Sequence, residues 1–139
     1  WNLPKPCLIM TTQISPAKIL QNLAERNGIK ISIIDGNTPT NIRKNKLNDL
    51  ASGALKYAIC STIFDEGIDL KELKSLILAG GGRSQIKMIQ RIGRGLRPAP
   101  GKSEFILIDF NDNNSKILKR HFNERIKIWK EQGYKIEYV

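Results

Sequence analysis

The chain has 139 residues, of which 23 are Lys or Arg and 13 are Asp or Glu, so its formal net charge is +10, and 40% of its residues are hydrophobic. This length and composition predict one basic domain that needs no disulfide or structural metal. No apolar run approaches the roughly 20 residues that cross a bilayer, and the amino terminus lacks the basic-then-apolar pattern of a secretory signal, so we expect a cytoplasmic protein without a membrane span. Cys7 and Cys60 lie in separate apolar runs without metal-site spacing, and both are expected to be core thiols.

Short apolar runs alternate with longer amphipathic segments along the first 110 residues. The expected strands cover residues 7–12, 30–34, 57–61, 75–79 and 104–110. Central runs without polar alternation are typical of strands that are covered on both faces. Strands that alternate with helices are joined by right-handed crossovers and run parallel. The pattern therefore predicts an α/β fold, a three-layer sandwich around a mainly parallel sheet.

End signals locate two helices between the first three strands. Ser15–Pro16 forms an expected cap and first-turn proline, and Gly28 ends that helix. Thr38–Pro39 repeats the signal for the second helix, which Gly53 ends. The inner faces are expected to carry Ala17, Leu20, Leu23 and Ala24 in the first helix and Ile42, Leu47, Leu50 and Ala51 in the second.

The character of the chain changes at residue 111, where a polar turn begins. The apolar positions of the following segment recur at near-helical spacing and predict a packing stripe; they are Leu118, Phe122, Ile126 and Trp129. A short strand is expected over residues 134–139. His121 is expected at the surface or an interface. Residues 1–110 thus form the main lobe, and residues 111–139 form a helix and strand packed on the same domain.

A basic stretch from residue 83 to residue 102 contains six cations and no carboxylate. Such a stretch favours a polyanion, and arginine matches phosphate oxygens two at a time. Arg94 and Arg97 point the same way in helical geometry, and Gly93 leaves room for a close approach. Two converging guanidiniums repel each other unless an anion lies between them. Arg83, after three glycines, is a further candidate contact to nucleic acid or nucleotide; a solvated basic face is the alternative for the stretch.

A second candidate site follows the third strand. In open parallel sheets, ligands bind at the carboxyl ends of the strands. Hydroxyls of Ser61 and Thr62 and freed backbone amides there suit phosphate oxygens, and Gly67 permits close backbone approach. Asp69 could accept a hydrogen bond from a sugar hydroxyl. An ordinary turn, with Asp69 as a cap, remains the alternative. At the end of the fifth strand, Asp109 is expected either to orient a cation of the basic stretch, Arg91 or Arg94, or to act as a cap.

Three segments in this order resemble a known family. Residues 90–97 (QRIGRGLR) resemble motif VI of superfamily-two helicases, residues 61–69 resemble motif V, and residues 7–12 resemble motif IV. The resemblance implies the second, carboxyl-terminal RecA-like lobe of an ATP-dependent helicase or translocase. The tail is similar to phage branch-migration helicases and to restriction-subunit and DNA-repair helicases. This similarity favours DNA, single-stranded or branched, as the partner.

The resemblance also implies roles for individual residues. Arg97 would be the arginine finger on the γ-phosphate, Arg94 its companion, and Gln90 a neighbour of the same phosphate. The other implied contacts are Gly67, Asp69 and Gly93 to the nucleotide and Ser61 and Thr62 to the nucleic-acid backbone.

The chain lacks the phosphate-binding loop G-x-x-x-x-G-K-[ST] and the metal-binding carboxylates, which the family carries in its first lobe. ATP and Mg²⁺ are therefore expected to be held mainly by an amino-terminal lobe of the same polypeptide, of which this chain, beginning at Trp1, would be one part. We expect no metal ligands here, and an isolated domain that is monomeric and inactive. Two alternatives stay open: a non-catalytic nucleic-acid-binding module, and the lobe of an RNA helicase.

Overall fold

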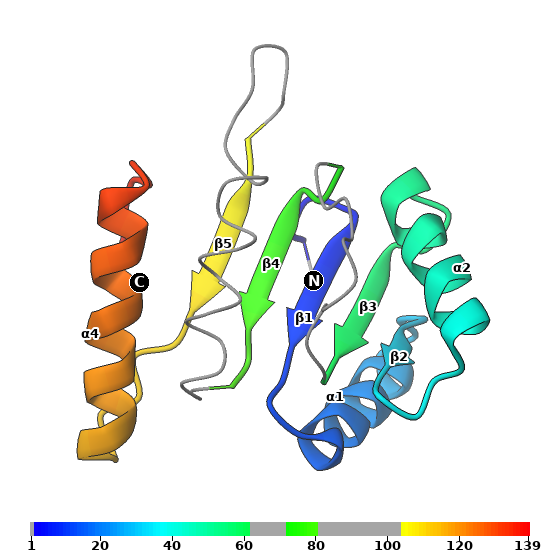
Figure 1. Ribbon diagram of the computed structural model, residues 1–139, viewed down its shortest axis with the longest axis horizontal. Coiled ribbons are helices and arrows are strands. Elements are labelled where there is room, and N and C mark those ends of the chain that lie inside the picture. Colours follow the sequence, from blue (N-terminus) through cyan, green and yellow to red (C-terminus); the bar gives the residue numbers. More distant parts are fainter. Residues whose placement is uncertain (1, 62–71, 81–103) are drawn as a thin grey trace.

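The computed structural model describes residues 2–61, 72–80 and 104–139. The described strands are β1 (Cys7–Met10), β2 (Ser32–Ile34), β3 (Tyr57–Cys60), β4 (Ser75–Leu78) and β5 (Ile106–Asp109), and the described helices are α1 (Ile14–Arg26), α2 (Thr40–Ser52) and α4 (Lys116–Glu131) (Figure 1). The strands form one sheet in the order β2-β3-β1-β4-β5, and every pair of neighbours is parallel. The parallel sheet predicted from the alternation is confirmed.

Helices cover both faces of the sheet. On one face, Leu8 of β1 shares a core cluster with Leu50 of α2 and Trp129 of α4. On the other face, Ile9 of the same strand clusters with Ala17 of α1. Successive strand residues point to opposite faces, so β1, at the centre, is buried along its whole length. This arrangement confirms the predicted three-layer sandwich.

The predicted start of α1 is wrong by two residues, because the N-cap is Gln13 and not Ser15. The helix begins at Ile14 after Gln13, which makes no side-chain capping hydrogen bond. The preceding turn is closed by Thr11 instead, whose Oγ1 donates to the Gln13 carbonyl oxygen at 3.0 Å. Pro16 then lies in the first helical turn, where a missing N–H costs nothing because that N–H has no partner within the helix.

The predicted cap of α2 is also wrong. Thr38 does not cap the helix, because Asp35 Oδ1 accepts from both its Oγ1 and its backbone N–H at 2.8 Å. The helix starts at Thr40, after Pro39 at the N-cap. Its predicted end is confirmed: Gly53 is the C-cap and has a φ of +80°.

Two apolar residues predicted to face inward point outward. The exposed fractions are 47% for Leu23 and 44% for Ile42. Residue 23 directly precedes Ala24, so it is turned by about 100° from the side of α1 that packs on the sheet. The small side chains Ala17 and Ala24, both fully buried, make that close packing instead.

The tail packs on the same core as the rest of the sheet. Phe122 and Trp129 are 6% and 3% exposed, which confirms the packing stripe. The surface position expected for His121 is wrong, because the residue is 8% exposed and belongs to the buried side of α4. The strand expected over residues 134–139 is absent from the described structure. Tyr134 and Ile136 of that segment pack against the core cluster, so their alternation reflects packing and not strand pairing.

Candidate nucleic-acid and nucleotide site

The carboxyl ends of four strands meet along one edge of the sheet. The register pairs Met10 of β1 with Cys60 of β3 and with Leu78 of β4, and Leu78 with Asp109 of β5. The residues that follow these positions therefore lie side by side. In a parallel sheet this edge is where ligands bind, because the connecting loops gather there.

Ser61 is the predicted site residue that the structure describes, and it lies on this edge. Its backbone N–H donates to the Ile34 carbonyl oxygen at 3.3 Å, which continues the contact between β3 and β2 by one residue. On the other side, the backbone N–H of Thr11 donates to the Cys60 carbonyl oxygen at 2.9 Å. The backbone at Ser61 is thus held from both sides, and within the described residues its hydroxyl makes no hydrogen bond.

The other predicted site residues lie outside the described residues. They are Thr62, Gly67, Asp69, Arg83, Gln90, Gly93, Arg94 and Arg97. Their assignments stay predictions.

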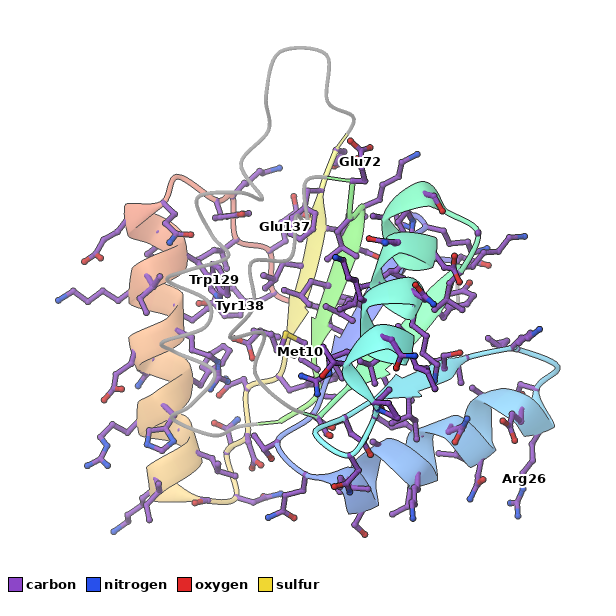
Figure 2. All side chains as sticks on the ribbon, turned by 45° about the vertical axis from the view of Figure 1, so that its right-hand side comes forward. Met10, Arg26, Glu72, Trp129, Glu137 and Tyr138 are labelled. Atoms are coloured by element: carbon purple, nitrogen blue, oxygen red, sulfur yellow. The ribbon has the colours of Figure 1, made fainter. Side chains whose placement is uncertain are left out.

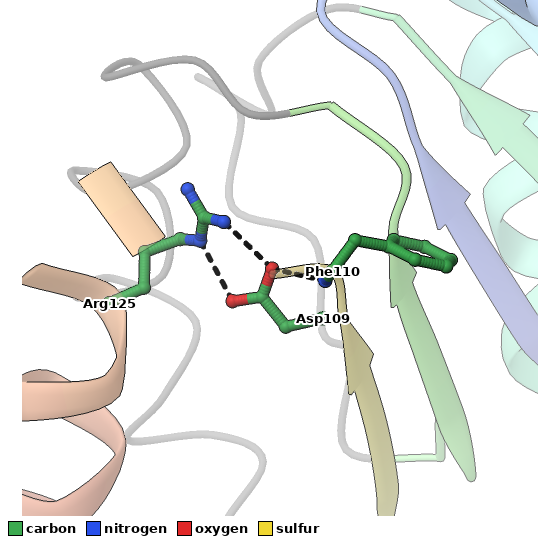
Figure 3. A network of polar contacts seen from close by, with 3 residues as sticks. All are labelled: Asp109, Phe110 and Arg125. Carbon is green, nitrogen blue, oxygen red and sulfur yellow. Dashed lines mark hydrogen bonds and ion pairs between the residues drawn. The ribbon is translucent and has the colours of Figure 1, made fainter. Parts of the chain in front are cut away.

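An ion pair at the end of β5 was not foreseen. Asp109 accepts from Arg125 of α4 through two hydrogen bonds of 2.8 Å, from Nε to Oδ2 and from Nη2 to Oδ1 (Figure 3). The side chains are 2% exposed for Arg125 and 6% for Asp109. Oδ1 also accepts from the backbone N–H of Phe110 at 2.8 Å. The partners expected for Asp109, Arg91 and Arg94, lie outside the described residues.

A signal for this pair is present in the sequence. His121, Arg125 and Trp129 are spaced by four, so a guanidinium falls in the middle of the buried side of α4. A buried guanidinium needs a carboxylate, and Asp109 is the acid at the end of the neighbouring strand. The pair fastens α4 to the edge of the sheet that carries the candidate site.

The described part of the chain contains neither a cluster of metal ligands nor a membrane-spanning helix. Among residues 2–61, 72–80 and 104–139, no three His, Cys, Asp or Glu side chains gather so that they could hold a metal ion. No helix in these same ranges is long and apolar enough to cross a membrane.

A fully parallel sheet with helices on both faces and a hydroxyl residue at the carboxyl edge defines an α/β domain of the open-sheet class, whose members generally bind ligands at that edge. The chain belongs to the family of the helicase conserved C-terminal domain, whose model matches residues 2–99. It is the carboxyl-terminal RecA-like lobe of superfamily-two helicases, which confirms the resemblance found in its motifs.

Similar proteins include helicases of several kinds. The chain is 32% identical over 115 residues to putative helicase 22 of a Sulfolobus islandicus filamentous virus, covering 83% of this chain and 21% of the viral protein. It is 34% identical over 88 residues to the putative DNA 3'-5' helicase Rad25 of Halobacterium salinarum, covering 63% of this chain and 14% of the Rad25 protein. The Pyrococcus furiosus Hef helicase domain has the same fold, with a TM-score of 0.57 and 23% identity over 89% of this chain and 24% of that one. RNA helicases are also among the similar proteins. The chain spans about a fifth or less of the length of the curated relatives it matches first.

Proposed function

We propose that this chain is the carboxyl-terminal motor lobe of an ATP-dependent DNA helicase or translocase and supplies the arginine finger of a split ATPase site. The observation that carries the proposal is the sequence QRIGRGLR at residues 90–97, which lies inside the matched family region of residues 2–99. The three arginines and two glycines of this segment suit a phosphate chain that has to be approached closely.

In the proposed mechanism, ATP binds between two lobes. The first lobe would hold ATP together with Mg²⁺, whose charge offsets the charge on the phosphates. Arg97 would donate to the γ-phosphate oxygens as charge develops in the transition state, with Arg94 beside it and Gln90 near the same phosphate. Asp69, Gly67 and Gly93 would contact the nucleotide, so that its binding draws the lobes together.

Nucleic acid would lie along the carboxyl edge of the sheet. The Ser61 hydroxyl, on a backbone held by β1 and β2, would donate to a phosphate oxygen, and Thr62 and Arg83 would extend the contact. Closure on ATP and reopening after hydrolysis would shift these contacts along the strand. Contacts of this kind go to the backbone and require no particular base sequence.

DNA is the proposed partner, with RNA as the alternative. Gln90 takes the place at which a large RNA-remodelling branch has His, and the tail resembles that of DNA helicases. The relative called DNA 3'-5' helicase Rad25 supports DNA, and the RNA helicases among the similar proteins support the alternative. The choice between DNA and RNA is tested by the rate of ATP turnover in the presence of each, because only the nucleic acid along which the motor moves should raise that rate.

The test of the proposal is ATP turnover by this chain, with and without the amino-terminal lobe of its parent polypeptide and single-stranded DNA. We expect turnover only when both lobes are present, and Arg97→Ala should lower it by about 10³-fold or more. Arg26→Ala is the matched control, because Arg26 lies at the far end of α1, away from the site (Figure 2). Turnover by this chain alone, or turnover retained in Arg97→Ala, would refute the split site.

A further inference from the structure

A hollow of about 380 Å³ lies at the carboxyl edge of the sheet, beyond the ends of β4 and β5. Its lining includes Pro16 and Ile19 of α1, Gly80 after β4, Phe110 and Asp112 after β5, and Arg125 of α4. This volume is within the range of small-ligand pockets, about 300–1,000 Å³. It opens between the first turns of α1 and α4, on the same edge as Ser61.

The hollow has a buried hydrogen-bond donor that is not used. Arg125 is 2% exposed, and its Nε and Nη2 both donate hydrogen bonds to Asp109. Its third nitrogen, Nη1, is buried and makes no hydrogen bond in the structure (Figure 3). An unpaired buried guanidinium nitrogen is costly, so we expect it to pair with an acceptor of a bound ligand.

The hollow also has a hydrogen-bond acceptor. One oxygen of Asp112, Oδ1, accepts from the backbone N–H of Asn114 at 3.1 Å. In the described structure the other oxygen accepts no hydrogen bond. A donor and an acceptor in one apolar hollow match the edge of a nucleobase, which presents both kinds of group.

The lining of the hollow includes exposed apolar residues, and exposed cations lie on the two helices that contribute to it. Phe110 and Ile19 are 56% and 58% exposed, although both are large apolar residues. Neither helix has an acidic residue in its first turn. Exposed cations on these first turns and just beyond them are Lys18 of α1 and Lys116, Lys119 and Arg120 of α4. An aromatic face beside cations is the combination that binds single-stranded nucleic acid, because the base stacks and the phosphates pair with the charges.

We infer that this hollow receives one base of a single strand, which stacks on Phe110 while its edge contacts Arg125 and Asp112. The flanking phosphates lie against the exposed cations of α1 and α4. The inference rests on the proposed function, because it places the same strand that contacts Ser61, and it adds a contact to a base where the proposed function needs only contacts to the backbone.

The test compares two probes that differ only in their bases. Fluorescein-labelled dC 12-mer and an abasic 12-mer of equal charge are titrated with the chain, up to about 200 µM in about 20 mM salt, with anisotropy as the readout. We expect the dC 12-mer to bind at least about fivefold more tightly than the abasic one. Phe110→Ala should remove that advantage and leave the abasic affinity unchanged. Phe110 is largely exposed, so this variant should fold.

Three controls separate the possible outcomes. Tyr138→Ala removes an aromatic side chain that is 72% exposed and does not line the hollow, and it should change neither affinity. Ser61→Ala should weaken the binding of both probes equally, because it removes a contact to the nucleic-acid backbone. Asp112→Asn should weaken the binding of the dC 12-mer and leave the binding of the abasic 12-mer unchanged.

Equal affinity for the two probes, or a Phe110→Ala variant that keeps the preference for dC, overturns the base pocket and leaves the proposed backbone contact standing. Binding of neither probe overturns both.

Discussion

Asp109 and Arg125 are charged side chains with almost no contact with water. Two hydrogen bonds of 2.8 Å join them, and a third, from the backbone N–H of Phe110, holds the carboxylate. Burial of either charge alone would be costly, because the interior solvates a charge far less well than water does. The pair therefore holds β5 and α4 together through two residues that are 16 positions apart in the sequence.

Removing one partner of this pair should destabilise the protein strongly. Asp109→Asn leaves the Arg125 charge buried without a counter-charge, and we expect a loss of about 3 kcal/mol in the free energy of unfolding. Urea denaturation measures the loss. Asp49→Asn, on the exposed side of α2, is the control and should stay within about 0.5 kcal/mol of the unchanged protein. If the two variants are equally stable, the pair contributes no such stabilisation.

Cys7 should be chemically inert in the folded protein. It is 1% exposed, and burial raises the pKa of its thiol more than the hydrogen bond with Ser75 lowers it. A raised pKa leaves less of the reactive thiolate at any given pH. At pH 8 we expect neither Cys7 nor the buried Cys60 to react with a disulfide reagent until denaturant unfolds the chain. A Ser52→Cys variant, with its thiol at the exposed end of α2, should react at once, and equal rates for all three thiols would contradict the prediction.

At the scale of the elements, helix ends were more predictable than helix starts. Gly53 ends α2 as expected, because the C-cap has a left-handed backbone conformation and glycine adopts this conformation most easily. The start of a helix depends on which of several possible hydrogen bonds a capping side chain makes. Thr38 does not cap α2, because its hydroxyl donates to Asp35 in the turn before the helix. Apolar spacing likewise did not fix which side of a helix is buried, as the exposed Leu23 and Ile42 show.

The residues at the candidate site also differ in whether the sequence predicts them. Ser61 was predicted at a strand end because the alternation of strands and helices determines where loops gather. Arg125 was not predicted: the spacing of His121, Arg125 and Trp129 places its guanidinium on the buried side of α4, but its pairing with Asp109 depends on how α4 packs beside β5. The hollow is likewise a product of tertiary packing, because its lining combines α1, the segment after β5 and α4.

The end of α2 offers a test of a single backbone conformation. At Gly53, φ is +80° and nothing lies within 4 Å of where a Cβ would stand, so a side chain there meets no neighbour. Gly53→Ala should therefore cost about 1 kcal/mol through its backbone conformation alone. Gly53→Asn should cost less, because Asn tolerates this conformation better. Thermal or urea unfolding of both variants measures the difference, and equal stability of Gly53→Ala and the unchanged chain would count against the left-handed cap.

At the scale of the whole molecule, the +10 charge has two explanations. A module that uses its charge only to hold phosphates would bind nucleic acid tightly by itself. A motor lobe carries one wall of a groove, and the opposite wall belongs to another lobe. The two explanations differ in the affinity of this chain alone.

We therefore expect this chain to bind a single-stranded DNA 12-mer weakly, with a dissociation constant of about 100 µM at about 150 mM salt, in the range of non-specific binding. Few phosphates are neutralised on one wall, so the logarithm of the affinity should fall gently with the logarithm of the salt concentration, by about 0.7 per phosphate on a single strand. Anisotropy titrations between about 50 and 200 mM salt measure both quantities. Adding the amino-terminal lobe should tighten binding and steepen the slope, because the second wall adds its own phosphate contacts. A dissociation constant below about 0.1 µM for the chain alone would instead favour the non-catalytic binding module.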